Sequence, residues 1–224
     1  MRFLILALAL CGGPLRADPL IGLPSAPALS AEGYALIVNA ETGGRAYYNR
    51  FLVHPEWPGG FSGITVGVGY DVGTVSPAVF WTDWRAMPEA DRERLVPVVG
   101  ITGQKAKSRL SEVRDILVSW DLAEGVFQEV DIPRFWQLTR ATFPGFDFLR
   151  PNAQASLCSI IFNRGNSMAG PGRAEMREIA RMAPKKDYAG MAGQIRAMKR
   201  IWAGKGQNGL LLRREAEAVL METP

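Results

Sequence analysis

Two carboxylates and one hydroxyl stand out as groups that could do chemistry: Glu41, Asp71 and Thr65. Glu41 precedes the glycine pair Gly43-Gly44, and the other two lie in a glycine-rich run over residues 63–73. A protonated carboxyl can act as a general acid, while an ionised carboxyl and a hydroxyl can hold and activate a water molecule. The three groups would suffice for acid–base hydrolysis if the fold brings them together.

The glycine-rich run predicts a strand that has to bend. Its apolar residues alternate with glycine or threonine, so one face is buried and the other is nearly bare: Ile64, Val66 and Val68. Thr65 and Asp71 share the bare face, but six extended residues would separate them by roughly 20 Å. Glycine accepts positive φ without steric cost, so Gly67, Gly69 and Gly73 can supply the bend. A glycine-rich hairpin without chemistry is the alternative.

Glu41 is expected at the end of a helix that positions it. Ser30 is a suitable N-cap and Gly43 a suitable stop for a helix over residues 30–41. Glu41 shares a face with apolar residues and lies near the negative end of the helix, and both influences disfavour its ionisation. We therefore expect Glu41 to hold the proton of a general acid, and Asp71, in an open turn, to stay ionised. A solvated helix end is the alternative.

The composition is that of a globular protein, with 224 residues, 47% hydrophobic and 21% charged. Residues 1–17 combine a basic start with a short apolar run, which predicts a signal peptide cleaved after Ala17 and export to the periplasm or medium. The run is too short to span a bilayer stably, although a buried helix or a membrane anchor is an alternative. Lipidation at Cys11 is a further alternative, disfavoured by the bulky Leu10 before it. Cleavage leaves Cys158 as the sole thiol.

Charge and histidine content exclude several classes of function. Loss of the leader lowers the net charge from +4 to +2, which is too little to indicate nucleic-acid binding. Basic residues are denser over 173–205, where a solvated helical face or contact with an anionic polymer are the two interpretations. His54 is the single histidine, so a zinc site is not expected, and a nucleophilic pair with the apolar-flanked Cys158 is disfavoured. We predict no metal and no cofactor.

Helical patterns occupy most of the remaining chain. The pattern predicts helices over residues 77–84, 88–99, 105–118, 131–143 and 150–165. It predicts two more, one from residue 187 and one from about residue 210. The helix from 187 shows a core stripe at steps of three and four residues: Tyr188, Met191, Ile195, Met198 and Trp202. The last helix places Leu212, Ala216, Val219 and Leu220 along one side. After a linker at 18–29, residues 30–224 predict one mostly helical α+β domain with a cleft between a small β part and a helical body.

These blocks resemble the phage-type lysozyme family (glycoside hydrolase family twenty-four), and most closely its pesticin-like members. The likeness lies in a helix ending in Glu41, a following glycine, and the Thr-Val-Gly-Val-Gly strand that starts at Thr65. In the phage enzymes an Asp lies between these Glu and Thr positions, whereas residues 42–64 contain none; in pesticin-like members the Asp follows the Thr, as Asp71 does here. Residues 154–165 resemble the family's central helix with its Phe-Asn-x-Gly end, and residues 202–217 its C-terminal signature. The stretch 75–149 matches least.

The resemblance implies a muramidase with a lysozyme-like fold, which hydrolyses the β-1,4 bond between N-acetylmuramic acid and N-acetylglucosamine in peptidoglycan. Glu41 would protonate the leaving oxygen, and Asp71 with Thr65 would position the water. Inversion is expected if the carboxyls stand roughly 6.5–9.5 Å apart, and retention near 5 Å. Tyr70 and Asn163 are candidate substrate-binding residues, each with a structural alternative.

Two other functions stay open at this point. A related glycan hydrolase of chitosanase-like type would use the same carboxylates, and a non-catalytic wall-binding protein could use the same scaffold without chemistry. The C-terminal pair Arg213-Arg214 could contact the glycan or brace Glu41, with surface ion pairing as the default. The expected partner is the glycan strand; an inhibitor or immunity protein is undetermined.

Overall fold

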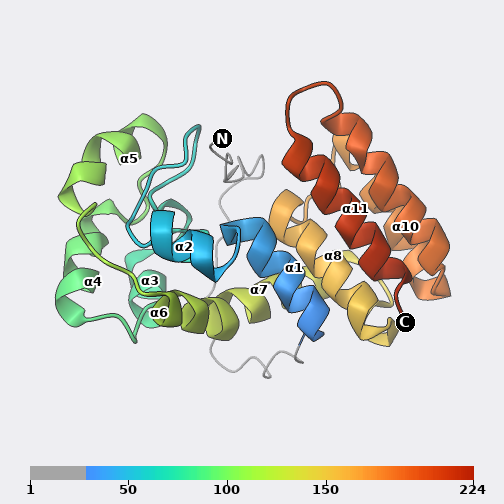
Figure 1. The fold of residues 1–224 in the computed structure, drawn as a ribbon, viewed down its shortest axis with the longest axis horizontal. Coiled ribbons are helices and arrows are strands. Elements are labelled where there is room, and N and C mark those ends of the chain that lie inside the picture. The colour runs from blue at the N-terminus through green and yellow to red at the C-terminus, as the bar shows by residue number, and fades with distance from the viewer. Residues whose placement is uncertain (1–28) are drawn as a thin grey trace. The chain divides into compact units, whose positions relative to one another are not determined.

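The computed structural model describes residues 29–224, which are predominantly helical with one two-stranded antiparallel sheet (Figure 1). The mostly helical α+β prediction is confirmed at this level. The predicted signal peptide, Cys11 and all but the last residue of the predicted linker lie outside the described residues. Within residues 29–224, no helix combines the length and the apolar character needed to cross a bilayer.

The described chain divides into two compact units. The first runs from Glu41 to Arg134, and the second holds the described residues up to Ala40 together with Phe135–Pro224. The first unit begins at the end of α1 (Ala31–Thr42) and continues through these elements: α2 (Arg45–Phe51), β1 (Thr65–Val66), β2 (Tyr70–Asp71), α3 (Pro77–Asp83), α4 (Glu89–Leu95), α5 (Gly103–Arg109) and α6 (Trp120–Val126).

Local signals explain where several of these helices begin. The Ser30 hydroxyl accepts the Gly33 amide proton (3.1 Å) at the start of α1, as predicted. Ser76 caps α3 through the Val79 amide (3.3 Å), with Pro77 at the first helical position. Ser119 caps α6, a helix that the sequence pattern did not predict. The expected helix over 105–118 is wrong beyond residue 112, because α5 ends at Arg109 and passes into a single 3₁₀ turn.

Aromatic side chains form the core of the first unit beneath the hairpin. Trp84, Phe80 and Tyr48 are fully buried, and Tyr70 meets Trp84 edge to face with ring centroids 5.5 Å apart. The three apolar hairpin residues predicted to face inward are buried: Ile64, Val66 and Val68. The alternation predicted from sequence is therefore confirmed.

The prediction that a helix begins at Asp131 is wrong, because the chain is already helical before this residue. Helix α6 passes through a π-helical turn, Phe127–Asp131, directly into α7 (Ile132–Thr142). Pro133 lacks an amide proton and its ring crowds the carbonyl four residues earlier, which a regular α-helix cannot accommodate. A π turn widens the backbone at that point and relieves the conflict. The proline was read from the sequence as a helix start and instead marks an irregular turn inside a longer helix.

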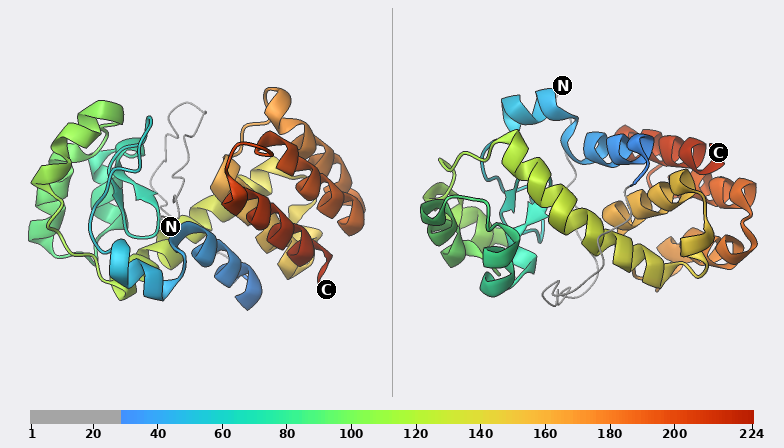
Figure 2. Two further views of the ribbon diagram at one scale, coloured as in Figure 1. Left: turned by 45° about the horizontal axis from the view of Figure 1, so that its top comes forward. Right: turned by 90° about the horizontal axis from the view of Figure 1, so that it is seen from below.

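The second unit is a set of packed helices: α8 (Pro151–Arg164), α9 (Ala174–Met182), α10 (Tyr188–Ala197) and α11 (Asn208–Glu222). Helix α11 packs against both α8 and α10, and α10 stays alongside α11 in every view (Figures 1 and 2). The prediction for α8 is confirmed closely, since its apolar residues are buried on all sides: Ala153, Leu157, Ile160 and Ile161. On α10 and the turn after it, Met191, Ile195 and Met198 are buried as predicted.

Helix α11 buries mainly the face opposite to the one predicted, although Leu220 of the predicted side is buried. Leu212 is 72% exposed and Val219 51%, whereas Arg213, Arg214 and Glu217 are buried. One carboxylate oxygen of Glu217 accepts from Arg214 Nη2 (2.6 Å) and Arg213 Nε (3.1 Å), and also from a buried serine of α8. The prediction that Arg213 and Arg214 form ion pairs on the surface is also wrong, because both pair with Glu217 in the interior.

Candidate active site

The hairpin places Thr65 directly opposite Asp71. Strands β1 and β2 pair antiparallel in the register Thr65↔Asp71 and Val66↔Tyr70. The chain reverses at Gly67 and Gly69, whose φ values are 65° and 74°. The predicted bend is confirmed at these two glycines, whereas Gly73, the third candidate, lies in the 3₁₀ turn Val72–Thr74 that follows the hairpin. Residues paired in this way share one face of the sheet, so the hydroxyl and the carboxylate become neighbours although six residues separate them in the chain.

The backbone bonds of Thr65 show which kind of cross-strand pair this is. Its amide and carbonyl form hydrogen bonds with the backbone of Glu56 on the other side of β1 (2.7 and 3.0 Å), so they form none with Asp71. Thr65 and Asp71 therefore form the closer, non-hydrogen-bonded type of pair, with Cα atoms about 4.5 Å apart. The Thr65 Oγ1 atom is buried and has no hydrogen-bond partner within the described part of the chain.

Two glycine backbones close around the Asp71 carboxylate. Oδ1 accepts the amide protons of Gly73 (2.8 Å) and Gly63 (3.0 Å), and Oδ2 also approaches the Gly63 amide (3.1 Å). A Cβ on Gly63 would lie 2.4 Å from Oδ1, so only glycine permits this approach. Burial raises the pKa of Asp71, and the Gly73 and Gly63 hydrogen bonds offset part of that shift. The expectation of an open turn is wrong, because packing of the glycine backbones desolvates the carboxylate.

Glu41 lies near the turn of the hairpin. A Cβ added to Gly69 would stand 3.8 Å from Glu41 Oε2, which is ordinary van der Waals contact. The bare face predicted for this strand thus allows a helix-borne carboxyl to approach the backbone. Glu41, Thr65 and Asp71 all belong to the first unit; Thr65 and Asp71 pair in the hairpin, and Glu41 Oε2 lies near its turn.

The two predicted substrate-binding residues have different surroundings. Tyr70 is 4% exposed, and its hydroxyl donates to Asp83 Oδ2 (2.6 Å), which favours a structural role in holding β2. Asn163 belongs to the second unit, near the end of α8. Its Oδ1 is buried and has no hydrogen-bond partner in the region that the structure describes.

Sequence reasoning missed a buried polar network behind the hairpin. Asp83 accepts hydrogen bonds from Tyr70 and from Arg134 Nη2 (2.7 Å), and Arg134 Nη1 lies 3.6 Å from Asp131 Oδ1. Asp83 and Asp131 are 8% and 6% exposed. The one available signal was Asp131 beside Pro133, which was interpreted as a helix start. The partners come from segments distant in the chain, which no local pattern reveals.

Cys158 and His54 show no sign of a second reactive site. Cys158 is buried in α8, and burial raises the pKa of its thiol to about 12. His54 Nδ1 lies 2.9 Å from the carbonyl oxygen of Ile116. Among residues 29–224, no three His, Cys, Asp or Glu side chains are arranged to hold a metal ion.

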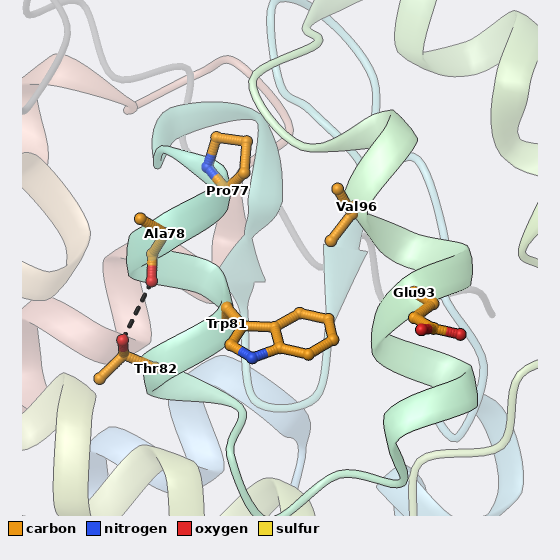
Figure 3. A pocket seen from close by; sticks show the side chains of 6 residues that line it. All are labelled: Pro77, Ala78, Trp81, Thr82, Glu93 and Val96. Atoms are coloured by element: carbon orange, nitrogen blue, oxygen red, sulfur yellow. Dashed lines mark hydrogen bonds between the residues drawn. The ribbon is translucent and has the colours of Figure 1, made fainter.

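A separate pocket of about 610 Å³ lies between α3 and α4. Figure 3 shows the Trp81 ring reaching across it toward α4, beside Val96. The Arg92 guanidinium stacks on Trp81, 4.3 Å from the ring centroid. The lining is mainly apolar with Glu93 as its single carboxylate, so the pocket lacks the pair of groups that acid–base hydrolysis needs.

Comparison with protein-family models finds no match to the chain, and comparison with curated proteins finds none. What the hairpin site can do has to be read from its own residues.

Proposed function

We propose that this chain is a muramidase that hydrolyses the β-1,4 bond between N-acetylmuramic acid and N-acetylglucosamine in peptidoglycan. The observation that supports it most is the hairpin register, which sets Thr65 opposite Asp71 while Glu41 Oε2 lies near Gly69 in the turn of the same hairpin. The motif resemblance described above supports the choice of substrate. Glycan strands of the cell envelope are the proposed partner, and export by the N-terminal leader is part of the proposal.

The pair Thr65 and Asp71 is suited to hold the attacking water. Three hydrogen bonds from backbone amides use part of the acceptor capacity of the Asp71 carboxylate and leave lone pairs on Oδ2. The buried Thr65 hydroxyl can donate to the same water or accept from it. A water held between the two would be oriented by both and could pass a proton to Asp71 as it attacks.

Glu41 is placed to act from the other end of the hairpin. Its Oε2 lies 3.8 Å from where a Cβ on Gly69 would stand, and the two residue steps from Gly69 to Asp71 span about 6.6 Å of extended backbone. An inverting reaction needs roughly 6.5–9.5 Å between the acid and base carboxyls, so that a water fits between them, and the proposal assigns inversion to this pair. Glu41 would protonate the leaving oxygen while Asp71 takes the proton of the water.

The proposal is tested by digesting purified peptidoglycan with the wild-type chain and with Glu41→Gln. Glu32→Gln is the matched control, because Glu32 lies on the same helix, is exposed, and takes no part in the site. Mass spectrometry should show reducing-end muramic acid products from wild type and control and none from Glu41→Gln. Proton NMR of the fresh product should show inverted anomeric configuration. No soluble fragments from the folded wild-type protein would refute the proposal.

One observation favours a second, non-catalytic function. The Asp71 carboxylate caps the 3₁₀ helix Val72–Thr74, which is a sufficient structural reason for an aspartate there. On that alternative the hairpin is a binding surface for the wall. Co-sedimentation with insoluble peptidoglycan and no bond cleavage would support it, and cleavage of chitosan in place of peptidoglycan would instead indicate the chitosanase-like alternative.

A further inference from the structure

A short extended segment at Glu56 lies beside β1, on the side away from β2. The Glu56 amide donates to the Thr65 carbonyl (3.0 Å) and the Thr65 amide donates to the Glu56 carbonyl (2.7 Å), so the two residues form a hydrogen-bonded antiparallel pair. Residues opposite each other in such a pair carry their side chains on the same face of the sheet. Since Thr65 is also opposite Asp71, the side chains of Glu56, Thr65 and Asp71 lie in one row with Thr65 in the middle.

The carboxyl of Glu56 is half-buried and has no role in the mechanism described above. Burial raises its pKa, and no charged group or hydrogen bond of residues 29–224 acts on it to offset that effect. A partly desolvated carboxyl without a donor is unfavourable, and a donor group on a bound molecule would relieve that cost. Glu56 is therefore an acceptor suited to a ligand, in the same row as the two residues proposed to hold the water.

The chain leaves this row at Glu56 and returns to it at Gly63. The Gly63 amide donates to Asp71 Oδ1 (3.0 Å), at the opposite end of the row from Glu56. Residues 56–62, which we call the rim loop, thus begin at the backbone partner of Thr65 and end beside the amide that binds Asp71. Both ends of the rim loop are attached to the candidate active site.

Contacts within the rim loop hold its shape. Trp57 Nε1 donates to the Ser62 carbonyl (3.0 Å), and the same carbonyl accepts from the Gly103 amide (2.9 Å), which ties the loop to the start of α5. Its tip turns at Gly59 and Gly60, whose φ values are 113° and 62°. These contacts restrain the loop before a ligand binds, so binding to it costs less ordering entropy.

The rim loop turns one aromatic ring outward. Phe61 is the most exposed large apolar side chain of residues 29–224, at 85%, although the next two residues, Ser62 and Gly63, are buried. The face of an aromatic ring carries partial negative charge and attracts the polarised C–H groups of a sugar ring. A ring that stacks and a carboxylate that accepts from a hydroxyl are the two kinds of contact that a carbohydrate needs.

We propose that the rim loop is a sugar-binding subsite of the candidate active site, in which Phe61 stacks on a pyranose ring and Glu56 accepts a hydrogen bond from a hydroxyl or acetamide N–H of the same glycan strand. This inference rests on the proposed function, because it takes the strand that is cleaved as the ligand. A lipid surface is the other partner that an exposed phenylalanine suits. The carboxylate of Glu56 in the same loop favours the glycan, since anionic headgroups would repel it.

The test measures binding without cleavage. A peptide-free tetrasaccharide of alternating N-acetylglucosamine and N-acetylmuramic acid is titrated into the full chain carrying Glu41→Gln, which keeps the ligand intact, and calorimetry gives the Kd. Adding Phe61→Ala should raise the Kd by roughly 5–20-fold, and Phe61→Tyr, which keeps a ring, should not. Adding Glu56→Ala should raise the Kd by a similar factor. Phe148→Ala and Glu32→Ala are the matched controls, because both side chains are exposed and lie outside the rim loop, and they should leave the Kd unchanged.

Several outcomes would overturn the proposal. One is an unchanged Kd in either Phe61→Ala or Glu56→Ala, and another is a parent protein that does not bind the tetrasaccharide. A fall in the urea midpoint of Phe61→Ala would assign the ring a structural role instead. Binding to phosphatidylglycerol vesicles that Phe61→Ala abolishes, with saccharide affinity intact, would indicate a lipid surface. If wild type binds the saccharide through the rim loop but releases no products from peptidoglycan, the proposed hydrolysis fails and the subsite stands.

Discussion

Replacing Thr65 by valine separates the catalytic use of its hydroxyl from any structural use. Valine has nearly the shape of threonine but no hydroxyl, and Thr65 Oγ1 is buried without a hydrogen-bond partner in residues 29–224. Nothing in the described fold therefore loses a bond in Thr65→Val. The proposed function, in contrast, assigns this hydroxyl to the attacking water, so activity and stability should respond in opposite directions.

The expected magnitudes follow from the burial of the hydroxyl. A buried, unsatisfied hydroxyl costs about 1–3 kcal/mol, so the free energy of unfolding should stay constant or rise by up to about 2 kcal/mol in Thr65→Val. Loss of one water-positioning hydrogen bond should lower kcat by roughly 10–100-fold, equivalent to about 1.4–2.7 kcal/mol of transition-state stabilisation.

The assays are urea unfolding followed by tryptophan fluorescence, and release of reducing ends from peptidoglycan. Thr139→Val is the matched stability control, because Thr139 is also buried but donates to the Phe135 carbonyl (2.6 Å). That variant should lose about 1 kcal/mol. Thr65→Ser keeps the hydroxyl and should retain most of the activity that Thr65→Val loses.

Two results would refute this reasoning. If the free energy of unfolding of Thr65→Val is lower than that of wild type by more than about 1 kcal/mol, the hydroxyl makes a stabilising hydrogen bond in the fold. The premise that it has no structural partner would then be wrong. If Thr65→Val cleaves peptidoglycan at the wild-type rate, the hydroxyl takes no part in the reaction.

Three further predictions concern close packing and buried charge. Gly63→Ala should destabilise the chain by roughly 1–3 kcal/mol in urea unfolding and reduce hydrolysis, because the new Cβ would lie 2.4 Å from Asp71 Oδ1; Gly125→Ala, which meets no atom within 4 Å, should be harmless. Glu217→Gln should lower the free energy of unfolding by about 3–5 kcal/mol, because it removes the buried carboxylate that pairs with two arginines of α11. Urea unfolding of the folded fraction of each protein measures this loss. Asp131 has a raised pKa of about 7, so the folded state binds more protons than the unfolded state between about pH 4 and 7. Asp131 should make stability fall with rising pH there by at most about 4 kcal/mol, and Asp131→Asn should remove this contribution from the slope measured by urea unfolding.

The candidate site was predictable to the extent that it depends on local backbone. Alternation of apolar residues and glycines along residues 63–73 predicted a buried face, a bare face and a bend, and the hairpin has all three. The need to bend followed from distance alone, since extended strand would hold Thr65 and Asp71 apart. The surroundings of Asp71 were not predictable, because they depend on how tightly Gly63 and Gly73 pack against its carboxylate.

Buried charge was the main point that the sequence pattern could not anticipate. A helix-period pattern assigns charged residues to the solvent side, and for α11 that assignment is wrong. Ser159 and two arginines donate to Oε1 of the buried Glu217, and Ser159 is 58 residues away in the chain. Asp83 and Arg134, 51 residues apart, form the second such pair.

By itself, the sequence determined the helical character of the chain, the ends of helices such as α3 and α8, the core stripe of α10 and the bend of the hairpin. Each of these depends on neighbours within a few residues: a capping hydroxyl, a proline at a first turn, a glycine with positive φ. Only the tertiary structure decided which carboxyls are buried, which guanidinium they share and which face of α11 points inward. Those outcomes depend on desolvation and on partners from distant segments, and both are set by the packed fold.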